Sequence, residues 1–183
     1  EWTASNWKKD VEQNGDWGLV SSTVNEKEHF YLKTLNDSRF FTISKKFDSF
    51  SNVGKNFSFF YVTSNTQSIE CGGSYVKLFP STVEPKTLKG GEHEDKYNIM
   101  FGPDICGSNK KIHLIISHKE DNLQNKKNIK YEDKNEYTML GFTIFENQTY
   151  SVTVNENVVE QGSIKDDYPV PPEMIDDVSD VKP

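Results

Sequence analysis

Residues 137–154 have the sequence YTMLGFTIFENQTYSVTV, and this stretch decides the fold class. Two runs rich in aromatic and β-branched residues, 137–145 and 150–154, flank the polar segment 146–149. Runs of this composition favour β-strands, and a short polar segment between two of them is typical of a hairpin turn. We therefore predict an antiparallel hairpin here.

Similar short runs recur along the chain, at 57–62, 75–79 and 111–116, and segments rich in Asn, Gly, Asp and Ser separate them. No sustained helical periodicity accompanies these runs. Many short strands at this spacing predict an all-β fold, either an antiparallel sandwich or a barrel. With 183 residues, the chain is long enough to bury a substantial core.

The end of the chain has a different composition. Residues 165–183 contain four of the seven prolines and six acidic side chains. Proline removes a backbone donor and favours an extended chain. We therefore predict one folded domain over residues 1–164, followed by a non-globular, acidic, Pro-rich segment over residues 165–183.

The charge balance disfavours a nucleic-acid partner, and the hydropathy disfavours a membrane span. The formal net charge is −7, whereas nucleic-acid binding depends mainly on an excess of Lys and Arg. No apolar run approaches the roughly 18–20 residues that span a bilayer. We expect no nucleic-acid partner and no membrane span in this chain.

The two cysteines, Cys71 and Cys106, have no second Cys or His nearby in the spacing of a metal knuckle. We favour a disulfide between them, which would indicate an oxidising compartment. The alternative is a pair of unrelated buried thiols.

Two unusual stretches adjoin these cysteines, CGGSYVKLFP at 71–80 and YNIMFGPDICG at 97–107. A disulfide would bring their ends within about 7 Å, Cα to Cα, and would align the two segments as neighbours. Tyr75 and Lys77 would then share one face of a strand. The face suits a neutral polyhydroxylated ligand, because tyrosine and lysine donate hydrogen bonds and Asp104 accepts pairs of them. The alternative is that the tyrosines are ordinary sheet aromatics and Lys77 is a solvated charge.

These two stretches resemble the lectin-domain motifs of the calreticulin/calnexin family of endoplasmic-reticulum chaperones, and Phe79-Pro80, Asn98-Ile99 and Ile105 resemble its calreticulin branch. Further similarity extends over nearly the whole chain. The resemblance implies a concanavalin-like jelly-roll β-sandwich of antiparallel sheets. Residues 1–164 would form this lectin-like domain without its C-terminal strands and helix, and residues 165–183 would begin the family's proline-rich arm.

The resemblance also implies a function. The expected protein is a calcium-dependent lectin chaperone of the endoplasmic reticulum lumen, and not an enzyme. It would bind monoglucosylated high-mannose N-glycans on incompletely folded glycoproteins, and a thiol-disulfide oxidoreductase or another co-chaperone through the arm. The calcium ligands are not assigned, although we expect an early loop around residues 26–33 to supply backbone oxygens.

The roles of individual residues follow from the same resemblance. Hydrogen bonds to the sugar are expected from Tyr75, Lys77, Tyr97 and Asp104. Apolar contacts are expected from Met100 and Ile115. Support of the pocket is expected from Gly72, Gly73 and His113. On a regular strand Tyr97 and Met100 would face opposite sides. We therefore expect the strand to begin after Tyr97 or to contain a bulge.

Two other functions stay open. One is a peptide- or protein-binding chaperone, or a calcium-storage module, with a degenerate sugar site; Ser74 in place of the family's third glycine and the longer stretch 81–96 favour it. The other is a glycoside hydrolase, which needs two carboxylates about 5–9.5 Å apart. The acidic cluster Glu92, Glu94 and Asp95 is the only dense one outside the Pro-rich segment, and its Gly- and Lys-rich surroundings indicate a solvated loop.

Overall fold

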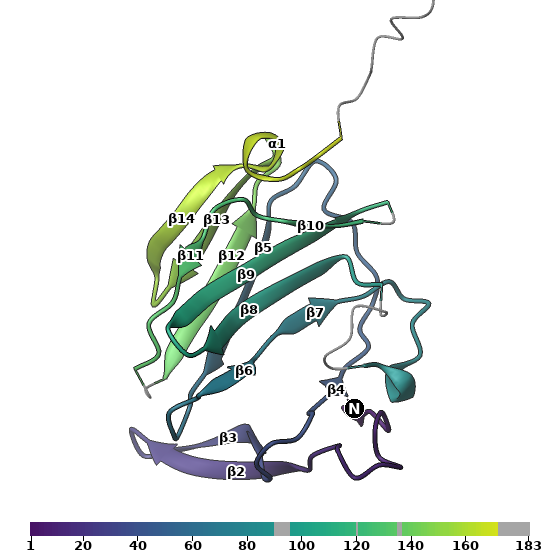
Figure 1. Ribbon diagram of the computed structural model, residues 1–183, viewed down its shortest axis with the longest axis vertical. Helices are drawn as coiled ribbons and strands as arrows, with labels where there is room; N and C mark the ends of the chain where they lie inside the picture. The colour runs from purple at the N-terminus through teal and green to yellow at the C-terminus, as the bar shows by residue number, and fades with distance from the viewer. Residues whose placement is uncertain (90–95, 120, 135–136, 172–183) are drawn as a thin grey trace, which may run out of the picture. The chain divides into compact units, whose positions relative to one another are not determined.

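The computed structural model describes residues 1–89, 96–119, 121–134 and 137–171. Within these residues the chain forms fourteen β-strands, one 3-10 turn and one short α-helix (Figure 1). It divides into two units, one of residues 1–50 and 79–96 and the other of residues 51–78 and 97–183. The acidic cluster Glu92, Glu94 and Asp95 lies outside the described residues.

The first unit contains a hairpin and a short strand pair. Strand β2 (Trp17–Val24) pairs antiparallel with β3 (Lys27–Thr34) along its whole length, while β1 (Thr3–Ala4) pairs with β4 (Ile43–Ser44). A 3-10 turn, η1, spans Pro85–Thr87. The turn between β2 and β3 is built from Asn25 and Glu26, which have φ angles of +49° and +63° as in a tight two-residue hairpin. The expectation of a loop around residues 26–33 is therefore wrong, because residues 27–33 are paired in β3.

One sheet of the second unit has the order β14-β13-β12-β5. Its strands are β5 (Phe57–Thr63), β12 (Thr138–Ile144), β13 (Thr149–Val154) and β14 (Asn157–Ser163). Strands β12 and β13 form the hairpin predicted from residues 137–154, and Gln148 takes a positive φ of +62° in its turn. Alternate side chains along β5 are half-buried and exposed, which is the pattern of a strand with one face on the core.

The other sheet is centred on β8 (Ile99–Cys106) and β9 (Asn109–His118). Strands β6 (Cys71–Gly73) and β7 (Val76–Leu78) both pair with β8 on one side. Strands β10 (Asp121–Gln124) and β11 (Ile129–Lys130) both pair with β9 on the other. Each outer position of this sheet is thus occupied by two short strands with an interruption between them, at residues 74–75 and at residues 125–128.

The two sheets of the second unit share one apolar core. Phe101 from β8 packs edge to face on Phe142 from β12, with ring centroids 5.0 Å apart, and both side chains are 1% exposed. Tyr61 from β5 packs on Phe101 in the same way at 6.0 Å. Two antiparallel sheets that enclose one core form a β-sandwich, as predicted.

Residues after position 164 also pack against the core of the second unit. A short helix, α1 (Ile164–Asp167), leads to Tyr168, which is 1% exposed and donates a hydrogen bond of 3.0 Å to the Leu114 carbonyl. The chain therefore contacts the core at least to Val170, beyond the boundary expected at Ile164. That boundary stays a prediction, and residues 172–183 of the expected arm lie outside the described part of the chain. No helix among the described residues has the length and apolar character required to cross a membrane.

Candidate carbohydrate-binding site

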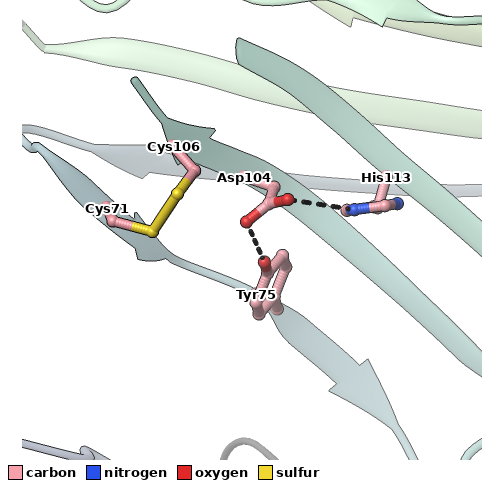
Figure 2. Close-up of a disulfide and its surroundings, with 5 residues drawn as sticks. All are labelled: Cys71, Tyr75, Asp104, Cys106 and His113. Carbon is pink, nitrogen blue, oxygen red and sulfur yellow. Dashed lines mark hydrogen bonds and ion pairs between the residues drawn. A yellow bond between two sulfur atoms is a disulfide. The ribbon is translucent and has the colours of Figure 1, made fainter. Parts of the chain in front are cut away.

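The disulfide between Cys71 and Cys106 joins β6 to β8 (Figure 2). The two cysteines are directly opposite in the strand register, with Cα atoms 4.0 Å apart. The same register places Gly73 opposite Asp104, and Lys77 on β7 opposite Met100. The predicted disulfide is confirmed, and the two segments lie side by side as expected from it.

Asp104 is held between an aromatic hydroxyl and an imidazole. The Tyr75 hydroxyl donates a hydrogen bond of 2.8 Å to Asp104 Oδ1, and His113 Nε2 lies 3.5 Å from Asp104 Oδ2 (Figure 2). The Asp104 side chain stays 31% exposed and that of His113 is 17% exposed. The carboxylate is therefore fixed in direction and still reachable by a ligand.

Burial determines the protonation of both partners of Asp104. Burial and the hydrogen bond to Asp104 raise the pKa of Tyr75 well above its ordinary value, so its phenol stays neutral and keeps its proton. Burial lowers the pKa of His113, and Lys111 lowers it further, while Asp104 acts in the opposite direction. At neutral pH the imidazole is therefore neutral.

Gly73 allows the Tyr75 ring to lie over the β6 backbone. A Cβ atom at Gly73 would come within 2.1 Å of the Tyr75 hydroxyl oxygen and within 2.3 Å of two ring carbons. At Gly72 a Cβ would meet only the Ile69 side chain, at an ordinary 3.5 Å. The two supporting glycines predicted from the sequence thus differ, and Gly73 is the one that positions Tyr75.

Gly102 and Tyr61 also shape the site, and sequence reasoning did not identify them. Gly102 has a φ of +147°, and a Cβ there would lie 2.1 Å from the Ser74 carbonyl oxygen and 3.0 Å from the Tyr75 Cα. The Tyr61 hydroxyl donates a hydrogen bond of 3.1 Å to that same carbonyl. These contacts fix the interruption between β6 and β7, from which Tyr75 projects. A glycine opposite the CGGSY motif was the only available indication, and it does not reveal contacts made across the sheet.

The other predicted residues form a second group on the same face. Met100 on β8 lies between Lys77 on β7 and Ile115 on β9 in the register, so all three side chains point to one side of the sheet. The Lys77 ammonium lies 5.3 Å from the centroid of the Tyr97 ring, within the range of a cation–π contact. Met100 and Asp104 are on the same side of β8, with Gly102 between them, so this group and the Asp104 group share one face of the sheet.

The backbone near Tyr97 resolves the geometric conflict between Tyr97 and Met100. Strand β8 begins at Ile99, after Tyr97, as expected. The Tyr97 carbonyl accepts a hydrogen bond from the Ser117 hydroxyl at the end of β9. The Tyr97 side chain is 2% exposed and that of Ile115 is 4% exposed, so these two form the floor of the face, while Tyr75, Lys77 and Met100 are half-buried.

No group of three or more His, Cys, Asp or Glu side chains in the described residues is arranged to hold a metal ion. The segment expected to supply calcium with backbone oxygens is strand β3. No calcium ligands are assigned among the described residues, and no step of the site's chemistry is assigned to calcium.

The fold defines the class of the protein as a jelly-roll β-sandwich. A solved structure of the T. cruzi calreticulin globular domain superimposes on the chain with a TM-score of 0.82 and 26% sequence identity; the match covers 97% of this chain and 67% of that one. A family model described as the Calreticulin family matches residues 1–183. The chain belongs to the calreticulin family.

Curated relatives support the same assignment. Calreticulin of Dictyostelium discoideum is 35% identical over 188 residues, which cover 100% of this chain and 43% of the relative. Calreticulin of Mus musculus is 42% identical over 155 residues, which cover 83% of this chain and 36% of the relative. The chain thus spans less than half the length of these relatives. The family consists of non-enzymatic, calcium-binding chaperones.

Proposed function

We propose that this chain forms the sugar-binding part of a lectin chaperone that works in the endoplasmic reticulum lumen. Its ligand is the terminal glucose of monoglucosylated high-mannose N-glycans on incompletely folded glycoproteins. Calcium dependence, and a co-chaperone such as a thiol-disulfide oxidoreductase that binds the proline-rich arm, belong to the same proposal.

The observation that carries the proposal is the fixed Asp104 carboxylate on the same face of the sheet as Lys77 and Met100. A carboxylate accepts hydrogen bonds from two adjacent hydroxyls, and an ammonium donates to a third. Because Tyr75 and His113 already orient the carboxylate, ligand binding does not have to order this side chain, and less conformational entropy is lost. Met100 supplies apolar contact for the C–H face of a sugar ring.

The geometry of Ser74 favours an intact sugar site over a degenerate one. Ser74 is exposed, and its contacts with the sheet are made by its backbone: its N–H donates to the Pro103 carbonyl at 3.0 Å and its carbonyl accepts from Tyr61. Any residue except proline supplies these backbone groups. The replacement of the family's third glycine therefore leaves the support of Tyr75 in place.

Calorimetric titration of the purified protein with two glycans tests the proposal. We expect binding of the monoglucosylated high-mannose glycan and at least about tenfold weaker binding of the same glycan without its glucose, because a lost set of hydroxyl contacts costs roughly 1–3 kcal/mol. Equal affinity for the two glycans would contradict glucose recognition.

Matched variants locate the site. Lys77→Ala and Asp104→Asn remove the donor and the charged acceptor, and both should abolish measurable binding. Lys55→Ala removes an exposed lysine of the same unit that lies outside the site, and should bind as the parent does. Peptide binding that persists in all three variants without glycan binding in the parent would favour the protein-binding alternative.

A further inference from the structure

The interruption between β10 and β11 forms a cavity of about 230 Å³ beside the proposed sugar site. Its lining is rich in cations and amides, including Lys111, Lys126, Lys127, His113, Gln124 and Asn128. Among the described residues that line it there is no Asp or Glu. This composition is unusual in a chain whose formal net charge is −7.

The side chains of two of the three lysines already form contacts within the protein. The Lys127 ammonium lies 2.9 Å from a carboxylate oxygen of Glu160 and 2.9 Å from one of Asp167. The Lys126 ammonium donates a hydrogen bond of 2.9 Å to the Asp166 carbonyl. Lys111 forms no ion pair within the described part of the chain, so, like Lys126, it has no carboxylate there to neutralise its charge.

The strand register increases the positive potential at Lys111. Lys130 on β11 is directly opposite Lys111 on β9, and like charges in directly opposite positions are mutually destabilising. Asp104 on β8 is opposite Lys111 on the other side, but its two oxygens face Tyr75 and His113. The positive charge of Lys111 acts on the neighbouring His113, whose pKa it helps to lower. A bound anion would relieve the repulsion between the two lysines.

We propose that this cavity binds a phosphate monoester, with Lys111 as its main charge partner and the amides of Gln124 and Asn128 as hydrogen-bond donors. The cavity is smaller than the roughly 300–1,000 Å³ of sites for drug-sized ligands, so it suits one small group rather than a large ligand. Phosphate oxygens accept charge-assisted hydrogen bonds from lysine and further bonds from amide N–H groups. The inference is independent of the proposed recognition of glucose.

Titration with three probes tests this assignment: inorganic phosphate, mannose 6-phosphate and mannose. At low ionic strength we expect both phosphates to bind and to weaken as salt is added, because screening reduces the attraction. Tighter binding of mannose 6-phosphate than of inorganic phosphate would show that the anion is carried on a sugar; equal affinities would identify the free anion as sufficient. Failure of both phosphates to bind at low salt would overturn the proposal.

Three variants identify the cavity. Lys111→Gln should weaken phosphate binding by at least about fivefold through loss of a charge-assisted bond. Asn128→Asp should weaken it too, because it places a carboxylate in the lining. Lys55→Gln removes the same charge from an exposed position outside the cavity, and equal weakening by Lys55→Gln and Lys111→Gln would contradict a specific site.

The phosphate and glucose proposals can fail separately. Lys77→Ala should leave binding of inorganic phosphate unchanged, because Lys77 does not line this cavity. Thermal unfolding of each variant, compared with that of the parent, verifies that a loss of binding does not come from a loss of folding.

Discussion

Gly72 and Gly73 are neighbours in β6 with different surroundings, and this difference provides a test of Tyr75. Gly73→Ala would place a methyl group within 2.1 Å of the Tyr75 hydroxyl oxygen, so the ring must move away from Asp104. We expect at least about tenfold weaker binding of the monoglucosylated glycan, in line with the loss of one or two hydrogen bonds.

Gly72→Ala is the matched control for this substitution. It adds the same methyl group at a position where the nearest atom is 3.5 Å away, and glycan affinity should stay within about twofold of the parent, because the contact is an ordinary one. Unchanged affinity in Gly73→Ala would show that the position of the Tyr75 ring does not matter for binding.

His113 makes the stability of the fold depend on pH. Burial lowers its pKa in the folded protein below the ordinary value of about 6.5, so the unfolded chain binds this proton more tightly. Where the unfolded state binds more protons, the free energy of unfolding rises with pH. The contribution of His113 is therefore complete above pH 6.5 and is lost as the pH falls towards the lowered pKa.

Urea unfolding between pH 7.5 and pH 5 measures this effect. The free energy of unfolding should fall on acidification in the parent, and the fall should be smaller in His113→Gln, which has no titrating group at this position. His29→Gln, at an exposed position of β3, should retain the parent's profile. A steeper fall in His113→Gln than in the parent would mean that the sign of the shift is wrong.

At the scale of single elements, α1 and the residue that follows it fix the end of the described chain to the second unit. The Tyr150 hydroxyl donates a hydrogen bond of 2.9 Å to Asp167 Oδ2, and Tyr150 and Tyr168 pack edge to face with centroids 5.6 Å apart. Gly162 leaves room for this approach, because a Cβ there would lie 1.8 Å from Asp167 Oδ2. The segment that leads towards the Pro-rich residues is therefore anchored in the core.

Truncation of Tyr168 tests this anchor. Tyr168→Ala should lower the free energy of unfolding by about 3–5 kcal/mol, as for other large aromatic side chains removed from a core. Tyr137→Ala truncates a tyrosine that is 60% exposed and should cost far less. Similar losses in the two variants, measured by urea unfolding, would show that the segment after α1 is not part of the cooperative fold.

Sequence patterns predicted strands well where one face is buried and poorly where it is not. Strands β5, β12 and β13 contact the core, and their composition identified them. Strand β3 has a single half-buried residue and seven exposed ones, so no alternation marks it, and the segment was expected to be a loop. Tyr168 was missed for a different reason: Asp and Pro dominate its surroundings in sequence, while its partner Leu114 is 54 positions away.

The candidate site was predictable only in part. The disulfide, the shared face of Tyr75 and Lys77, and Asp104 as an acceptor were predicted from composition, strand period and side-chain chemistry. The roles expected of Met100 and Ile115 came from the family resemblance and stay predictions. The bond from Tyr75 to Asp104, the support from Gly102 and Tyr61, and the burial of Tyr97 depend on contacts between strands, which the sequence of a single chain does not reveal.

At the scale of the whole molecule, the Cys71–Cys106 disulfide links positions 35 residues apart. By limiting the freedom of the unfolded chain, a loop of this length stabilises the fold by about 3–4 kcal/mol in the chain-entropy account. The double variant Cys71→Ser/Cys106→Ser should lose about this free energy of unfolding, and a reductant should destabilise the parent but not the variant. Identical urea midpoints for the parent and the variant would contradict a stabilising disulfide.

The interrupted outer strands of the β8–β9 sheet limit how readily a partly folded chain can pair with the borders of this sheet. An uninterrupted border strand offers a ladder of unsatisfied amide and carbonyl groups on which another polypeptide can assemble. Here β6 and β7 have three residues each, β10 has four and β11 has two, so neither border provides a long template. At this sheet, a protein proposed to bind unfolded glycoproteins by their sugars would therefore offer them little template for cross-chain β-structure.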